Sequence, residues 1–169
     1  LALVVSGGHT DLILMKGDYQ FEHIGGTLDD AIGECYDKVA RVIGLGYPGG
    51  PKVEKAALEG EHTYDLPMPM NDDSFNMSFS GLKSAVINLK HNEEQRGNTI
   101  IKENLACSFQ NRVVNILVKK TMRCLKEKNC KRLIIAGGVG ANKGLREAFS
   151  EACLKENVEL IVPDIKYCT

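Results

Sequence analysis

The chain has 169 residues, 43% hydrophobic and 25% charged, which is ordinary for a soluble globular domain with a core of its own. No apolar run approaches the roughly 20 residues that a membrane-spanning helix needs, and the opening sequence lacks the basic segment of a signal peptide. The formal net charge of −1 excludes a general attraction to nucleic acid, so any such contact requires a local basic patch.

The cysteines and histidines argue against a metal or disulfide scaffold. The six cysteines are scattered without a CxxC pair, so reduced thiols in a cytoplasmic protein are the simplest interpretation. The four histidines have no HxxxH or HExxH spacing, which gives no support to a protease-type zinc site. Because the chain begins with Leu1 and ends abruptly at Thr169, we expect a fragment of a longer protein.

The first third of the chain predicts strands followed by a helix. Short β-rich segments at Leu1–Val5, Leu12–Met15 and Tyr19–Ile24, separated by glycine turns, indicate a three-strand antiparallel meander. Thr27–Asp30 resembles a capping box. The apolar residues that follow recur at helical spacing as far as Ile43, and glycines before Pro48 should end that helix.

The middle of the chain, about residues 47–100, reads as a helical insertion. "GYPGGPKVEKAALEG" predicts a turn that leads into a short helix, and Ser80 is expected to cap another helix. The polar stretch His91–Thr99 is expected to be a loop. From Thr99 to about Lys128, one apolar face predicts a long helix; its residues are Ile101, Leu105, Phe109, Val113, Ile116 and Leu117.

The last third predicts a βαβ unit with two parallel strands. "KRLIIAGG" is typical of a buried strand, "GANKGLREAFSEACLKE" of a helix, and "VELIVPD" of a second strand. Together with the meander this gives an α/β fold: a mixed sheet with helices packed on its faces. We expect residues 1–169 to form a single domain.

Three glycine-rich turns are candidates for a ligand site. "SGGHT" at 6–10 could be a plain hairpin turn, or its glycines and hydroxyls could hold an anion. "AGGVGAN" at 136–142 precedes a helix whose N-terminal amides favour phosphate, with Asn142 as an N-cap or a base contact. "GYPGGP" at 46–51 is a rigid elbow or a place of close ligand approach. Convergence of all three turns on one cleft would suit a nucleotide.

One acidic and one basic group of residues also allow more than one interpretation. Asp30, Glu34 and Asp37 would lie along one side of a helix, where a cation, a ribose or Lys38 could offset their repulsion, or they could form a solvated face. One basic run could contact RNA phosphates or simply be a solvated helix end. Its members are Lys119, Lys120, Arg123, Lys126, Lys128, Lys131 and Arg132.

Five motifs in this order resemble the tRNA N6-adenosine threonylcarbamoyltransferases, a family once labelled O-sialoglycoprotein endopeptidases. They are "VSGGHT" (5–10), "LDDAIGECYDK" (28–38), "GLGYPGGP" (44–51), "SFSGLK" (78–83) and "AGGVGANKGLR" (136–146). The resemblance implies an actin-like ATPase fold with two ribonuclease-H-like lobes, of which this chain would be mainly the second. It also implies transfer of threonylcarbamoyl from threonylcarbamoyl-AMP to N6 of adenosine 37 in tRNAs that read codons beginning with A.

The resemblance assigns substrate-binding roles by position. The turn at Val4, Val5, Ser6, Gly7 and Gly8 would face the carbamoyl and phosphate end of the adenylate. Ribose hydroxyls would bind two carboxylates, Asp37 and Glu54; Gly50 would pack against the nucleotide, and Asn142 would contact adenine. Many relatives have Asp in place of Glu54 and Thr in place of Ser84, and some have Tyr in place of Val4.

The resemblance further implies one iron or zinc ion, whose ligands fall outside this chain: an upstream HxxxH and an aspartate directly after Cys168 and Thr169. Implied partners are tRNA, threonylcarbamoyl-AMP and other proteins of threonylcarbamoyladenosine synthesis, with a homodimer as one arrangement and no membrane. We expect the fragment alone to be inactive. Two alternatives stay open: a small-molecule kinase of the same clan and a non-catalytic interaction module.

Overall fold

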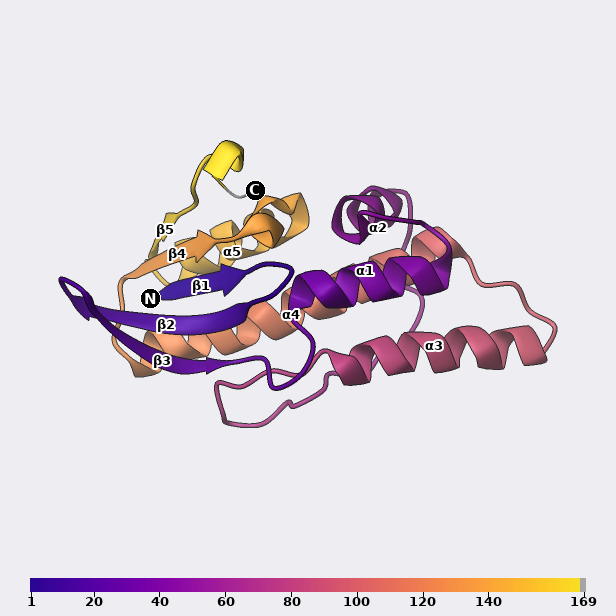
Figure 1. The fold of residues 1–169 in the computed structure, drawn as a ribbon, viewed down its shortest axis with the longest axis horizontal. Coiled ribbons are helices and arrows are strands. Elements are labelled where there is room, and N and C mark those ends of the chain that lie inside the picture. The colour runs from indigo at the N-terminus through magenta and orange to yellow at the C-terminus, as the bar shows by residue number, and fades with distance from the viewer. Residues whose placement is uncertain (168–169) are drawn as a thin grey trace.

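The computed structural model describes residues 1–167, which form a mixed five-strand sheet and five α-helices (Figure 1). The sheet order is β3–β2–β1–β4–β5. Its strands are β1 Ala2–Val5, β2 Thr10–Gly17, β3 Gln20–Gly26, β4 Arg132–Ala136 and β5 Glu159–Ile161. β2 is antiparallel to β1 and β3, whereas β4 is parallel to β1 and β5. The predicted meander and the parallel pair are confirmed.

The helices follow the predicted order. They are α1 Ile32–Ile43, α2 Gly49–Leu58, α3 Ser80–Gln95, α4 Lys102–Glu127 and α5 Lys143–Lys155, with short 3-10 helices η1 Gly138–Ala141 and η2 Ile165–Tyr167. α3 continues to Gln95, so the loop predicted from His91 is wrong over 91–95; charge suggested a loop, but Glu and Gln are good helix formers. Within residues 1–167, no helix is both long and apolar enough to cross a bilayer.

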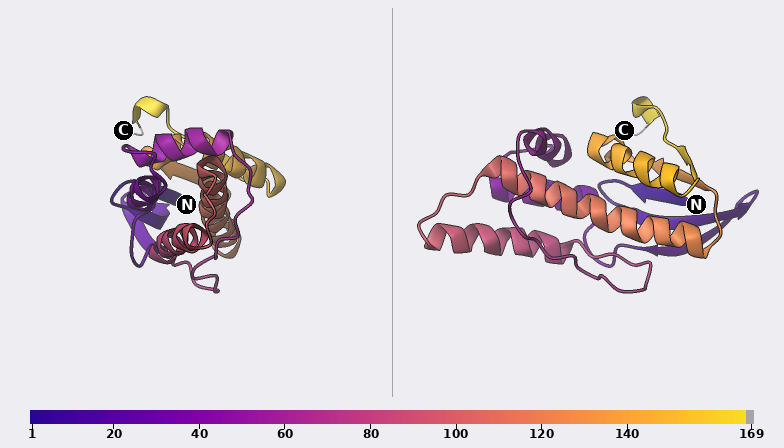
Figure 2. Two further views of the ribbon diagram at one scale, coloured as in Figure 1. Left: turned by 90° about the vertical axis from the view of Figure 1, so that its right-hand side faces the viewer. Right: turned by 180° about the vertical axis from the view of Figure 1, so that it is seen from behind.

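The sheet buries one face against α4 and α5. Side chains alternate along a strand, and the completely buried apolar residues on the central strands are Leu3, Val5, Leu12, Leu133 and Ile135. Both α4 and α5 lie on this face, as the view from behind shows (Figure 2). The expectation of helices packed on the faces of the sheet is therefore confirmed for this face. The apolar stripe of α4 is confirmed except at Ile101, which precedes the helix and is 54% exposed.

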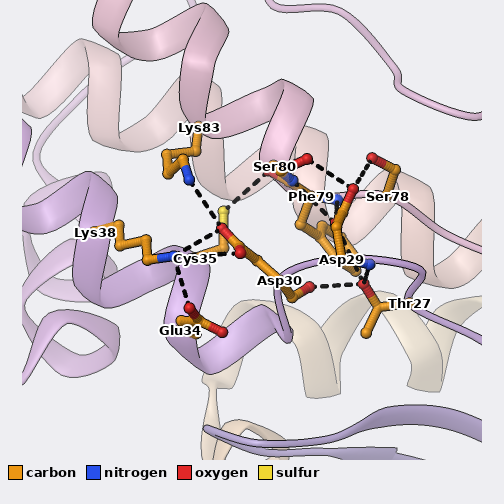
Figure 3. A network of polar contacts seen from close by, with 10 residues as sticks. All are labelled: Thr27, Asp29, Asp30, Glu34, Cys35, Lys38, Ser78, Phe79, Ser80 and Lys83. Carbon is orange, nitrogen blue, oxygen red and sulfur yellow. Dashed lines mark hydrogen bonds and ion pairs between the residues drawn. The ribbon is translucent and has the colours of Figure 1, made fainter.

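The caps expected at the starts of α1 and α3 are wrong. Ala31 is the N-cap of α1, and the Thr10 hydroxyl oxygen on β2 accepts the Ile32 amide hydrogen at 2.9 Å. Ser80 is the first residue of α3 rather than its cap. The acceptor there is the Asp29 carboxylate, from the loop after β3, which receives the Phe79 amide at 2.8 Å and the Ser80 hydroxyl at 2.7 Å (Figure 3). Each helix start is thus capped by a residue distant in the sequence.

Candidate functional site

A small hollow of about 120 Å³ lies where α1, the start of α2 and the turn after β4 meet. Three of the predicted site residues line it: Gly50, Glu54 and Asn142. The remaining lining residues are Tyr36, Pro51, Gly138, Val139 and Ala141. Two of the three glycine-rich turns therefore meet at one place, although 80 to 90 residues separate them in the sequence.

Asp37 lies beside this hollow rather than in its wall. Its Oδ1 accepts the Gly49 amide hydrogen at 2.8 Å, which satisfies one of the free N–H groups at the start of α2. The start of α2 approaches α1 so closely that a Cβ on Gly49 would lie 2.5 Å from the Asp37 Cα. One carboxylate oxygen of Asp37 therefore holds the α2 start in place against α1.

The Ser6–Gly8 turn lies against the first turn of α1. A Cβ on Gly33 would be 2.7 Å from the Gly7 Cα, and the Gly33 amide donates to the Ser6 carbonyl at 3.0 Å. Gly33 and Asp37 are four residues apart, about 6 Å along the helix axis, so the two close contacts lie on the same side of α1. Val5 is buried, and its carbonyl lies against Gly137, whose φ is 98°.

The Ser6–Gly8 turn differs from its prediction in one respect. Neither Gly7 nor Gly8 has a positive φ, and a Cβ on either would meet nothing within 4 Å. The Gly8 and His9 amides donate to the Ser6 Oγ at 3.3 and 3.0 Å. The turn is therefore exposed and open, but its own serine occupies two of the amides that were expected to hold an anion.

The start of α5 is also not a free anion site. The Lys143 amide donates to Glu54 Oε1 at 2.6 Å, and the Leu145 amide donates to the Asn142 side chain at 3.0 Å. Two of the N-terminal amides are therefore occupied, and the Glu54 carboxylate would repel a phosphate there. Asn142 is confirmed as the N-cap of α5, whereas phosphate binding at this helix start is disfavoured.

A buried amide pair that sequence reasoning missed lies behind the hollow. Gln110 of α4 donates from Nε2 to Asn142 Oδ1 at 2.8 Å, and Asn142 Nδ2 donates to Gln110 Oε1 at 3.2 Å. The Tyr36 hydroxyl also donates to Gln110 Oε1. The pattern offered one signal: Gln110 is a polar residue within the buried stripe of α4, between Ala106 and Val113.

Lysines neutralise Asp30, which precedes α1, and Glu34 in its first turn, whereas all three acidic residues were expected on one helix. Lys38 Nζ lies 2.6 Å from a Glu34 oxygen and 3.2 Å from Asp30, and Lys83 Nζ lies 3.2 Å from the other Asp30 oxygen (Figure 3). Among the alternatives offered for this group, pairing with Lys38 is confirmed for Asp30 and Glu34. Asp37 does not belong to this network, because its carboxylate faces Gly49.

Part of the basic run, on α4, holds a loop in place. Lys120, only 3% exposed, donates to the carboxylate and carbonyl of Asp72 and to the Ser74 carbonyl. Arg123 donates to the same Ser74 carbonyl and lies over the Phe75 ring at 4.7 Å from its centroid. These side chains stabilise the 71–75 segment, and they are not free for RNA phosphates.

The hollow is smaller than the roughly 300 Å³ or more of typical ligand pockets, so it can enclose only part of a ligand. Its polar groups are an amide and a carboxylate beside apolar atoms, a combination that suits a flat ring with attached hydroxyls. The open Ser6–Gly8 turn lies one helical turn away, where a second, polar part of the same ligand could extend. The hollow and the Ser6–Gly8 turn thus both lie against α1, one helical turn apart.

Solved structures with a related fold include two of HypF. Full-length HypF in its phosphate- and nucleotide-bound form matches with a TM-score of 0.58 and 18% identity, over 86% of this chain and 19% of that one. HypF of T. kodakarensis matches with a TM-score of 0.60 and 12% identity, over 88% and 18%. At these identities the likeness concerns the fold alone.

Closer relatives are found among curated proteins. The tRNA N6-adenosine threonylcarbamoyltransferase of Staphylococcus carnosus is 56% identical over the whole chain, and that of Staphylococcus aureus strain JH9 is 54% identical. The chain spans about half the length of these relatives, since the match covers 50% of each. The sequence profile of the TsaD family matches all residues, 1–169. The chain therefore belongs to the tRNA N6-adenosine threonylcarbamoyltransferase family.

Proposed function

We propose that the protein of which this chain is a part transfers threonylcarbamoyl from threonylcarbamoyl-AMP to N6 of adenosine 37 in tRNAs that read codons beginning with A. Family membership supports the reaction, and the names of the two relatives supply tRNA adenosine as the substrate. The observation that carries the proposal is structural: Gly50, Glu54 and Asn142 meet at one hollow, one turn of α1 away from the Ser6–Gly8 turn.

In this proposal the adenylate lies along α1. The adenine ring occupies the hollow beside Asn142 and packs against Gly50, where no side chain intervenes. The ribose hydroxyls donate to the remaining oxygens of Asp37 and Glu54, because each carboxylate already uses one oxygen for a backbone amide. The phosphate and the carbamoyl group extend toward the main chain of Val4–Gly8, away from the Glu54 carboxylate.

The reaction requires no protein nucleophile. The adenosine N6 attacks the carbamoyl carbon, the bond from that carbon to the phosphate oxygen breaks, AMP departs, and N6 loses a proton. The residues along α1 contribute orientation of the two reactants. The main chain of Gly7, whose amide is not among the two that Ser6 Oγ accepts, can approach the carbamoyl oxygen closely and stabilise its developing charge.

The family resemblance also implies an iron or zinc ion. Within residues 1–167, no three side chains of His, Cys, Asp or Glu come together in a way that could hold a metal ion. The described residues therefore do not fit a metal site by themselves, and we derive no step through a metal. The expected aspartate ligand follows Cys168 and Thr169, which lie outside the described residues.

The sheet order and the likeness to HypF support an actin-like, ribonuclease-H-like lobe, with 1–169 as one domain and 47–100 as its helical insertion. A tRNA substrate agrees with a cytoplasmic location and with partner proteins of the same modification. The fragment alone should be inactive, because half of the relatives' length is missing from it. Light scattering of the purified protein measures its molar mass and so distinguishes a monomer from a homodimer.

The test is nucleoside mass spectrometry of tRNA from cells depleted of the full-length protein. We expect threonylcarbamoyladenosine to fall and unmodified adenosine to rise at position 37, with recovery when the wild-type gene is restored. Unchanged modification would contradict the proposal. A coupled ADP assay on the purified protein addresses the small-molecule kinase, which alone among the alternatives predicts ATP-dependent phosphorylation of a small substrate.

A further inference from the structure

The buried pair of Gln110 and Asn142 has a fixed direction. The Leu145 backbone N–H can only donate, so the Asn142 atom that faces it at 3.0 Å must be the oxygen Oδ1. The Gln110 atom facing Oδ1 at 2.8 Å must then be the donor Nε2. It follows that Gln110 presents Oε1 to both Asn142 Nδ2 and the Tyr36 hydroxyl.

The Tyr36 hydroxyl stabilises this arrangement of donors and acceptors. Burial, the largest effect, raises the pKa of the phenol, so Tyr36 remains protonated and can donate to Gln110. The ring is held against Phe109 of the same α4 turn, with centroids 5.1 Å apart and an edge-on geometry. Gln110 itself is only 6% exposed and packs closely against the Gly144 backbone. Three helices, α1, α4 and α5, therefore fix one amide.

Counting hydrogen-bond capacity shows what remains for a ligand. Asn142 Oδ1 already accepts from Leu145 and Gln110, which uses both of its lone pairs. Asn142 Nδ2 uses one N–H on Gln110, and the Tyr36 hydroxyl oxygen is a further hydrogen-bonding neighbour of this amide. Because Oδ1 is fully used, any hydrogen bond between Asn142 and a ligand in the hollow must come from Nδ2 as a donor, with the ligand supplying the acceptor.

We infer that Gln110 is a positioning residue for the adenylate site of the proposed function, on which this inference rests. By holding the Asn142 amide in one orientation, Gln110 makes the hollow select a ring edge that presents a hydrogen-bond acceptor, such as an unprotonated ring nitrogen. Gln110 does not touch the ligand. Its effect reaches the base through Asn142 alone.

The experiment measures binding of AMP to the full-length protein by calorimetry, together with its 1-deaza, 3-deaza and 7-deaza analogues. Each analogue replaces one ring nitrogen by CH and so removes one acceptor. We expect one analogue to bind the wild-type protein about tenfold more weakly than AMP, as the loss of one oriented hydrogen bond implies. In Gln110→Met, AMP should bind about tenfold more weakly and the penalty for that analogue should shrink.

A double-mutant cycle separates positioning from folding. In an Asn142→Ala background, Gln110→Met should leave AMP affinity unchanged, because its only route to the ligand is gone. Ser108→Ala is the matched control: Ser108 is a buried polar residue two positions earlier on α4, and its hydroxyl donates to the Asn104 carbonyl and accepts the Tyr64 amide. This control should lower the melting temperature without changing AMP affinity.

Two results would overturn the inference while leaving the proposed function in place. One is that all three analogues bind the wild-type protein as AMP does. The other is that Gln110→Met lowers AMP affinity equally with and without Asn142. If the wild-type protein binds no AMP at all, the adenylate site itself is refuted, and the inference with it.

Discussion

Glu54 on α2 accepts a hydrogen bond from the Lys143 backbone amide at the first residue of α5, with 2.6 Å between Oε1 and N. Eighty-nine residues separate the two in the sequence. The contact closes one side of the hollow and joins the glycine-proline turn to the β4–α5 turn. The Glu54 carboxylate therefore has a structural role at the start of α5 in addition to the ribose contact that we propose for its other oxygen.

Replacing Glu54 by Ala should therefore affect stability as well as binding. The Lys143 amide loses its acceptor and the α5 start loses a favourable negative charge, so the free energy of unfolding should fall by about 1 kcal/mol. AMP affinity of the full-length protein should fall too. Glu147→Ala is the control, since its carboxylate only pairs with the exposed Lys143 side chain at 3.8 Å and should change stability by at most about 0.5 kcal/mol. Urea denaturation that finds equal effects would contradict this account.

Two adjacent glycines should respond in opposite ways to alanine. A Cβ on Gly50 meets nothing within 4 Å, so Gly50→Ala should keep or raise stability, by up to about 1 kcal/mol, because alanine favours the helix. The same methyl group enters the space assigned to the nucleotide, and AMP affinity should fall about tenfold.

Gly49→Ala is the matched comparison. Its Cβ would lie 2.5 Å from the Asp37 Cα, so the α1–α2 contact must open and stability should fall by about 1–3 kcal/mol. Thermal unfolding and calorimetry distinguish the two variants. Normal AMP binding by Gly50→Ala would remove this glycine from the site.

The Asp29 carboxylate should make stability depend on acid pH. Partial burial raises its pKa, but hydrogen bonds from Ser78, Phe79 and Ser80 outweigh burial and lower the pKa to about 2, from 3.8 (Figure 3). A lowered folded-state pKa means that the stabilisation is complete above about pH 4 and is lost as the pH falls through about 2.

Asp29→Asn tests this sign. At pH 7 the variant should be less stable than the wild type by about 1 kcal/mol, a value discounted because solvent screens this exposed carboxylate. The difference should disappear between about pH 4 and pH 2. Asp18→Asn, in the β2–β3 turn, is the control, since its side chain has no hydrogen-bond or ion-pair partner within residues 1–167. A gap between wild type and Asp29→Asn that stays constant down to pH 2 would contradict the assignment.

The thiols should differ sharply in reactivity. Burial, the largest effect, raises the pKa of Cys35 to about 12 and that of Cys124 to about 11, so almost no thiolate forms at pH 8. Partly exposed Cys107 and Cys130 should therefore react first with iodoacetamide, and Cys35 and Cys124 only after unfolding. Peptide mass spectrometry measures the order; labelling of native Cys35 as fast as Cys130 would argue against this packing.

Sequence patterns predicted what depends on near neighbours in the chain. Alternating residues identified the meander, the apolar stripe identified α4, and the strand–glycine–helix order identified the parallel β4–α5–β5 unit. The family motifs also selected Gly50, Glu54 and Asn142, which the fold brings to one hollow.

The rest depends on contacts that local patterns do not contain. Asp29 caps α3 from about 50 residues away, and Thr10 caps α1 from β2, so the local motifs before these two helices were misleading, whereas Asn142 directly before α5 was identified correctly. Glu54 accepts an amide at the α5 start that was expected to be free for phosphate. Gln110 of α4 contacts Asn142 at the start of α5. Such pairings follow from how the elements pack. In the sequence, the sign of the Gln110 contact is a polar residue within the apolar stripe of α4.

The most direct test of the central claim is a crystal structure of the full-length protein with a bound, unreactive adenylate. The account predicts adenine in the hollow with a ring acceptor facing Asn142, ribose beside Asp37 and Glu54, and the phosphate end at Gly7 and Gly8. Electron density for the nucleotide at any other place, for example between the end of α4 and β5, with the α1 site empty, would contradict it.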